Sequence, residues 1–153
     1  STKAGKTMKY ALKNAVILDG TKDMEPLRGQ SVLVEGETIV GLAPAGSEPM
    51  GFEPVDLTGK YLMPGLFNMH VHLAGSGKPQ KKQRDNEKLV KTIMGSGLTR
   101  AVAYSMVRGF ARDELMSGVT TIRTMGGLGN FDSRLRDEIA AGRQAGPRCP
   151  CSG

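Results

Sequence analysis

Residues 66–73 constrain this chain more than any other segment, because they form a short apolar run that also holds both of its histidines. A Pro64-Gly65 turn signal precedes the run, so the run is predicted to be a buried strand. Side chains at i and i+2 of a strand point to the same face, which directs His70 and His72 toward one point. Two convergent neutral imidazoles are typical ligands of zinc and its neighbours. A bare His-x-His also arises by chance, so the surrounding residues decide its meaning.

The pattern before this strand is typical of a small all-β unit. A strand is expected over 10–18, and residues 31–34 and 38–42 are predicted to form a hairpin around Gly36, which supplies the unusual φ of a short loop. A connection rich in proline and glycine follows over 44–54. Such a unit exposes strand edges that something must cover.

From residue 61 onward strands and helices alternate, which favours a parallel α/β fold. A helix is expected from 98 or 99 to 117, with Gly118 as its C-terminal cap, and a second strand over 119–122. A second helix is expected to begin at an Asp132 N-cap and to end by Gly146-Pro147. One side of the first helix is sampled by Leu98, Val102, Met106, Phe110 and Asp113. Its apolar face is broadened by Ala101, Ala103, Val107 and Leu115.

Residues 56–73 as a whole, Asp-Leu-Thr-Gly-Lys-Tyr-Leu-Met-Pro-Gly-Leu-Phe-Asn-Met-His-Val-His-Leu, resemble the signature opening of the metal-dependent amidohydrolase superfamily. The resemblance continues at 118–127 and 134–148, and favours the imidazolonepropionase-like and Xaa-Pro-dipeptidase-like branch. It implies a (β/α)8 TIM-type barrel preceded by a small β-sandwich, and hydrolysis of C–N bonds by metal-activated water.

The residue pattern and the resemblance together imply a domain plan. Residues 1–7 are expected to be a disordered tail or a cloning remnant, and 8–61 the N-terminal part of the β-sandwich domain. Residues 62–153 are expected to form the first part of the hydrolase barrel, with its first two β/α units. A complete barrel typically needs about 250 residues, whereas this chain has 153. The remainder of the same barrel is therefore an expected partner.

In the resembled family His70 and His72 would hold the more buried metal of a site with one or two divalent ions, zinc by default. The chain departs from the family pattern at Asn68 and Thr124, where acidic residues are usual. The family's later metal ligands, which include two further histidines and an aspartate, have no counterpart, since the chain has 2 histidines in all. No catalytic residue and no site for another cofactor is assigned.

Composition limits the alternatives. The net charge is +6, but much of it lies in the run from Lys78 to Arg84 with Lys88 and Lys91, which has no interleaved aromatic residue. A solvated loop is favoured over nucleic-acid binding, and a cationic lid for an anionic substrate group is the weaker alternative. No apolar run approaches the roughly 20 residues of a membrane span, so a cytoplasmic protein without membrane partners is expected.

Two cysteines, Cys149 and Cys151, could bind metal or oxidise. Nothing nearby completes a four-ligand zinc site, so they are interpreted as the start of a third barrel strand. So low a cysteine content suits a reducing cytosol.

Two functions from different classes follow. The first is the N-terminal portion of a metal-dependent amidohydrolase that acts on a small-molecule amide, peptide or cyclic amide and is a homo-oligomer when complete. The second is a non-catalytic fragment or binding and assembly module without a complete active site.

Overall fold

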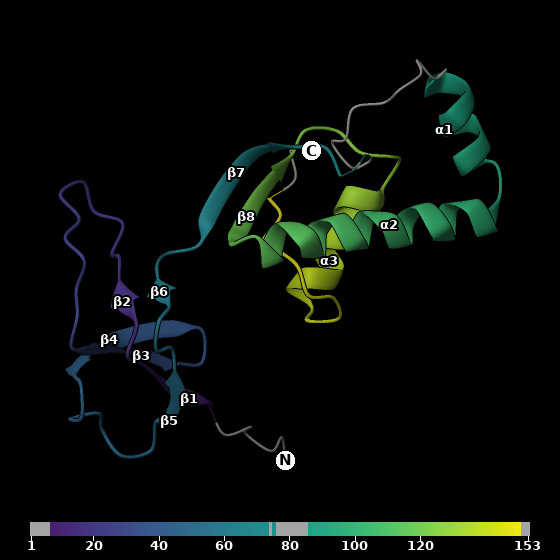
Figure 1. Cartoon of the computed structure of the whole chain (residues 1–153). Coiled ribbons are helices and arrows are strands. Elements are labelled where there is room, and N and C mark those ends of the chain that lie inside the picture. The colour runs from purple at the N-terminus through teal and green to yellow at the C-terminus, as the bar shows by residue number, and fades with distance from the viewer. Residues whose placement is uncertain (1–6, 74, 76–85, 151–153) are drawn as a thin grey trace, which may run out of the picture. The chain divides into compact units, whose positions relative to one another are not determined.

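The computed structural model describes residues 7–73, 75 and 86–150. The predictions for residues 1–6, for the 78–84 lysine run and for Cys151 concern positions outside these ranges. The chain divides into two compact units, Ser1–Pro64 and Gly65–Gly153 (Figure 1). Strands fill the first unit and strands with helices fill the second, so the predicted mixed α/β class is confirmed.

The first unit is built from six short strands. Four of them make one sheet in the order β4-β3-β1-β5, and the other two form a separate parallel pair. Within the larger sheet β1 pairs antiparallel with β3 and parallel with β5, and β3 pairs antiparallel with β4. The predicted hairpin is thus present as β3 and β4, with Gly36 at a φ of 60° between them. The bounds are β1 Lys9–Lys13, β2 Val16–Ile17, β3 Gln30–Glu35, β4 Thr38–Pro44, β5 Glu53–Asp56 and β6 Tyr61–Leu62.

The single strand expected over 10–18 is wrong, because the chain breaks it at Asn14. This residue has a φ of 65°, in the left-handed region that asparagine tolerates better than most residues. Its side-chain amide donates a hydrogen bond of 2.8 Å to Asp56 Oδ1. The break separates β1, which joins the four-stranded sheet, from β2, which pairs with β6.

The two faces of the four-stranded sheet are both apolar. One face has a small core of Ala11, Leu33 and Ala43 with Phe52 packed against it. The opposite face lines an open apolar cavity of about 340 Å³, to which Leu12, Val32, Val34, Leu42 and Leu62 contribute. A sheet that is apolar on both faces is typical of a layer that packs against a second layer.

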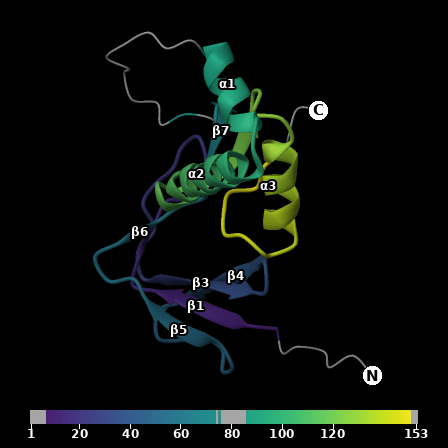
Figure 2. The same ribbon diagram turned by 90° about the vertical axis from the view of Figure 1, so that its right-hand side faces the viewer.

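The second unit is a parallel strand pair covered by helices (Figure 2). Strands β7 and β8 pair directly, and Arg148 forms a further parallel bridge to Thr121 on the other edge of β8. The third strand expected near the cysteines therefore begins as a single bridge, and Cys149 beside it is buried at 3% exposure. The bounds are β7 Leu66–Val71, α1 Asn86–Met94, α2 Gly97–Met116, β8 Val119–Thr124 and α3 Phe131–Ala140.

The long helix α2 lies where it was expected, but only part of its expected apolar face is buried. Ser96 caps it, with Ser96 Oγ accepting the Thr99 backbone N–H at 3.2 Å. The predicted inward residues Leu98, Val102 and Met106 are 77%, 56% and 56% exposed. The buried positions are Ala103 and Val107, which were expected on the apolar face, together with Tyr104 and Ala111.

Two further differences concern the other helices. Residues 86–94 form α1, where the sequence indicated only a solvated, lysine-rich loop. Helix α3 begins after Asn130, two residues before the predicted Asp132 cap. Its inward-facing residue Leu135 is fully buried. Among the described residues, no helix is long and apolar enough to cross a membrane.

Candidate metal site at the end of strand β7

Strand β7 starts with a close approach to β8. The Leu66 backbone N–H donates to the Gly118 carbonyl at 2.9 Å. A Cβ at Gly65 would lie only 1.9 Å from Thr120 Oγ1, so a larger residue there would push the two strands apart. The close approach at Gly65 thus fixes where β7 begins its pairing with β8.

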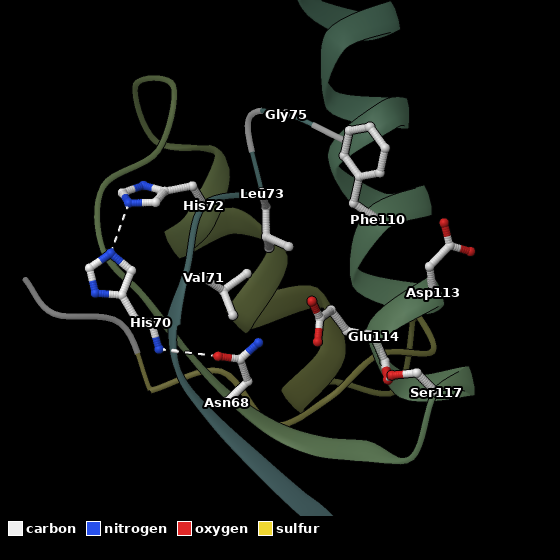
Figure 3. Close-up of a pocket in the computed structure, with 10 residues that line it drawn as sticks. All are labelled: Asn68, His70, Val71, His72, Leu73, Gly75, Phe110, Asp113, Glu114 and Ser117. Carbon is white, nitrogen blue, oxygen red and sulfur yellow. Dashed lines mark hydrogen bonds between the residues drawn. The ribbon is translucent and has the colours of Figure 1, made fainter. Parts of the chain in front are cut away.

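The burial pattern at the end of β7 separates two faces. Val71 and Leu73 are 6% and 2% exposed and belong to the same hydrophobic core as the buried residues of α2. His70 and His72 alternate with them and are exposed. Figure 3 shows both imidazoles on the side of β7 that points away from α2. The side of the pair that carries the histidines is called the open face below, and the opposite side the helix face.

The two imidazoles converge. His70 Nε2 and His72 Nε2 are 3.1 Å apart, and the ring centroids are 5.0 Å apart at 67°. Two nitrogens bound to one tetrahedral zinc at about 2.0–2.1 Å would be separated by roughly 3.3 Å. The histidine pair therefore has the spacing of two ligands of a single metal ion.

A β-bulge places His70. Along the ladder Asn68 is opposite Ile122 and Val71 is opposite Thr124, so two residues of β7, Met69 and His70, stand against the single Arg123 of β8. A bulge of this kind redirects side chains and leaves a backbone group without its ladder partner. Here Asn68 Oδ1 accepts the His70 backbone N–H at 3.3 Å.

The pair supplies half of a tetrahedral donor set. Among the described residues, no group of three or more His, Cys, Asp or Glu side chains could hold a metal ion. Two imidazoles leave a tetrahedral zinc two ligands short. The donor chemistry fits a divalent transition metal, and the remaining positions would be filled by groups outside this part of the chain or by water.

An open cavity of about 400 Å³ lies between β7 and α2 (Figure 3). Residues 68 and 70–73, which include both histidines, line it from the strand side, whereas α2 contributes an aromatic ring and two carboxylates. It borders the edge of β7 opposite β8, an edge that is unpaired within the described ranges. The α2 residues are Phe110, Asp113, Glu114 and Ser117.

Other positions near the strand ends have structural roles. In the glycine-rich segment after β8, a Cβ at Gly127 would lie 2.3 Å from Asp132 Oδ1, so glycine allows that carboxylate to lie against the backbone. Lys88 and Lys91 lie on α1 and not in a loop. Sequence reasoning missed the β7 bulge and the bond from His70 to Asn68. An asparagine two residues before the histidine was the available signal, since such side chains often bond nearby backbone.

Comparison with known proteins identifies the family. The sequence model of the Amidohydrolase family matches residues 61–152, which include both histidines. The chain belongs to this family. An imidazolonepropionase from Hyphomonas neptunium is 30% identical over 132 residues, covering 72% of this chain and 32% of that protein. A dihydroorotase from Bacillus pumilus is 36% identical over 75 residues, covering 49% of this chain and 17% of its own length.

Solved structures agree with the sequence relatives. A candidate prolidase from Bifidobacterium longum is 33% identical, with a TM-score of 0.71 over 95% of this chain and 30% of its own. A Xaa-Pro dipeptidase crystallised with methionine in its active site is 25% identical, with a TM-score of 0.69 over 95% of this chain and 33% of its own. This chain thus spans about a third or less of the length of these proteins.

Proposed function

We propose that this chain is the N-terminal portion of a metal-dependent amidohydrolase that cleaves C–N bonds in small amides, peptides or cyclic amides. The observation that carries the proposal is the pair of imidazole nitrogens 3.1 Å apart at the end of β7, within the segment that matches the family. Support also comes from the relatives, which bear the names dihydroorotase, imidazolonepropionase and deaminase.

In this proposal His70 and His72 hold a divalent metal, with zinc as the default from the ligand type. Such an ion would polarise a carbonyl as a Lewis acid and would lower the pKa of a water molecule to about 7. The chain's own residues do the positioning. Val71 and Leu73 anchor the strand in the core from the helix face, and Asn68 holds the backbone at His70.

The rest of a (β/α)8 barrel is proposed as the partner of the second unit. The open face of β7 leaves Phe67 69% and Met69 56% exposed, which is costly for apolar side chains in water. Parallel strands are usually covered on both faces, and the Arg148 bridge already begins a third strand. In the first unit, the apolar cavity above β1 and β3 is proposed to receive the second layer of a β-sandwich.

The alternative is a non-catalytic binding or assembly module. It shares the fold and the exposed surfaces but has no need of a metal. Metal content therefore separates the two possibilities better than any property of the fold.

The test measures bound metal by elemental analysis in the complete protein that contains this chain. We expect about one or two equivalents of divalent metal in the wild type. His70→Ala with His72→Ala should lower the occupancy at this site about tenfold or more, because a metal that loses two imidazoles has few ligands left. Hydrolysis of N-acyl amino acids, dipeptides and cyclic amides should fall in parallel.

Met69→Ala is the matched control, because Met69 directly precedes His70 in sequence and is exposed without a donor atom typical of zinc sites. It should retain both metal and activity. If the double histidine variant keeps its full metal content, the assignment of these two residues is wrong. A metal-free wild type that hydrolyses none of the panel would favour the non-catalytic alternative.

A further inference from the structure

We propose that Arg123 forms an anion-binding subsite beside the histidine pair and selects amide substrates that carry a carboxylate. The inference rests on the proposed function and deepens it, because it names the substrate class of the same site. It follows from where β8 places this side chain, from what lies opposite it and from the absence of local carboxylates on the two strands.

The burial pattern of β8 places Arg123 on the open face. Ile122 and Thr124 are 0% and 1% exposed, and Ile122 belongs to the core beneath the helices. Successive side chains of a strand point to opposite faces. Arg123, which is exposed between these two buried neighbours, therefore points to the side that carries the histidines.

The register brings Arg123 next to the histidine pair. The bulge in β7 sets Met69 and His70 together against Arg123, between the Asn68–Ile122 and Val71–Thr124 pairings. Neighbouring strands lie about 4.8 Å apart, a distance that a long arginine side chain spans easily. A ligand in contact with the imidazoles is thus within reach of the guanidinium.

No carboxylate of either strand competes for this cation. The sequences of β7 and β8, Leu-Phe-Asn-Met-His-Val and Val-Thr-Thr-Ile-Arg-Thr, contain neither aspartate nor glutamate. Other arginines of the unit are engaged: Arg134 Nε lies 3.0 Å from Glu138 Oε1, and Arg136 Nε lies 2.8 Å from Asp137 Oδ1. Arg123 has no such ion pair among the described residues.

The chemistry of the guanidinium indicates that the ligand is a carboxylate. Its planar fork matches a carboxylate through two parallel hydrogen bonds, and such charge-assisted bonds are stronger than neutral ones. A substrate whose amide reaches the histidine pair and whose carboxylate reaches Arg123 would be anchored at two points. N-acyl amino acids and dipeptides have this arrangement, whereas their C-terminal amides lack the charge.

The kinetic test compares N-acetylglycine with N-acetylglycinamide in the metal-loaded complete protein. Arg123→Ala should reduce kcat/KM for the carboxylate about 10- to 100-fold, mostly through KM, and change that for the neutral amide less than about threefold. Arg123→Lys should restore part of the difference. Arg112→Ala, which removes an exposed arginine on α2, is the matched control and should alter neither substrate.

A second measurement does not depend on activity. Binding of N-acetylglycine to metal-free protein, followed by NMR line broadening, should weaken in Arg123→Ala and persist in the double histidine variant. A wild type that binds the carboxylate without hydrolysing it would count against the proposed function but support the subsite. Equal losses for the charged and neutral substrates, or unchanged carboxylate binding in Arg123→Ala, would overturn the subsite itself.

Discussion

The helix face and the open face of the β7–β8 pair come from the same two strands, yet the chain covers them very differently. On the helix face Val71, Leu73 and Ile122 are at most 6% exposed and pack beneath α2 and α3. On the open face Phe67 and Met69 are more than half exposed, beside His70 and Arg123. The contrast separates the residues that hold the unit together from those that are available for chemistry.

The largest expected effect tests the helix face. Leu135→Ala on α3 should lower the free energy of unfolding by about 2–5 kcal/mol, because it leaves a cavity at a fully buried position. Met69→Ala on the open face should change it by less than about 0.5 kcal/mol. Urea denaturation of both variants measures the difference. Similar losses for the two would show that the open face is covered in solution.

A smaller effect concerns the contact that joins the covering helices. Tyr104 OH donates to Glu138 Oε2 at 2.8 Å, and the Arg134 guanidinium lies 4.1 Å from the Tyr104 ring centre. Burial and the bond to Glu138 raise the pKa of Tyr104 to about 12. Tyr104→Phe should cost about 1 kcal/mol at neutral pH.

The same pKa gives a pH signature. Between about pH 10 and 12 the unfolded chain loses the Tyr104 proton while the folded chain keeps it, so stability should fall as pH rises through this window. Below pH 10 this contribution is fully present. Thermal unfolding of wild type and Tyr104→Phe across pH 8–12 should show the extra fall only in the wild type. Parallel curves would mean that Tyr104 is not held as described.

The smallest expected effect tests the open face. Asn68→Ala removes the acceptor for the His70 backbone N–H, so the histidine should be held less firmly. We expect metal affinity to fall about three- to tenfold, with little change in the free energy of unfolding. Asn68→Asp, which keeps an acceptor oxygen, should retain this bond. Competitive titration with a chelating dye measures the affinities, and an unchanged value for Asn68→Ala would remove Asn68 from the site.

The sequence predicted the parts of the molecule in which local pattern and tertiary packing agree. Three features lie where the sequence predicted them: the β-branched run of β8, the glycine after α2 and the hairpin at Gly36. The convergence of His70 and His72 also follows from strand geometry. Their binding of a metal stays a prediction.

Other features of the fold depend on tertiary packing and strand pairing, which no local sequence pattern determines. Helix α2 has apolar residues on two sides, and the small side chains Ala103 and Ala111 were buried in preference to Leu98 and Met106 because they allow close packing. Helix α1 was not predicted, because its lysines suggested a solvated loop. Lysine side chains are solvated on an exposed helix as easily as in a loop. The bulge at Met69 and His70 exists only in the pairing with β8, so one strand alone cannot reveal it.

That bulge has a consequence for how the gene can change. In a regular strand the loss of one codon reverses the facing of every later side chain. At the bulge, β7 has one residue more than β8. Losing the Met69 codon would therefore leave a regular ladder in which His70 is still opposite Arg123 and His72 is still on the same face. Loss of the Val71 codon would instead turn His72 into the core. Length variation within this strand should therefore be tolerated at the bulge and selected against beyond it.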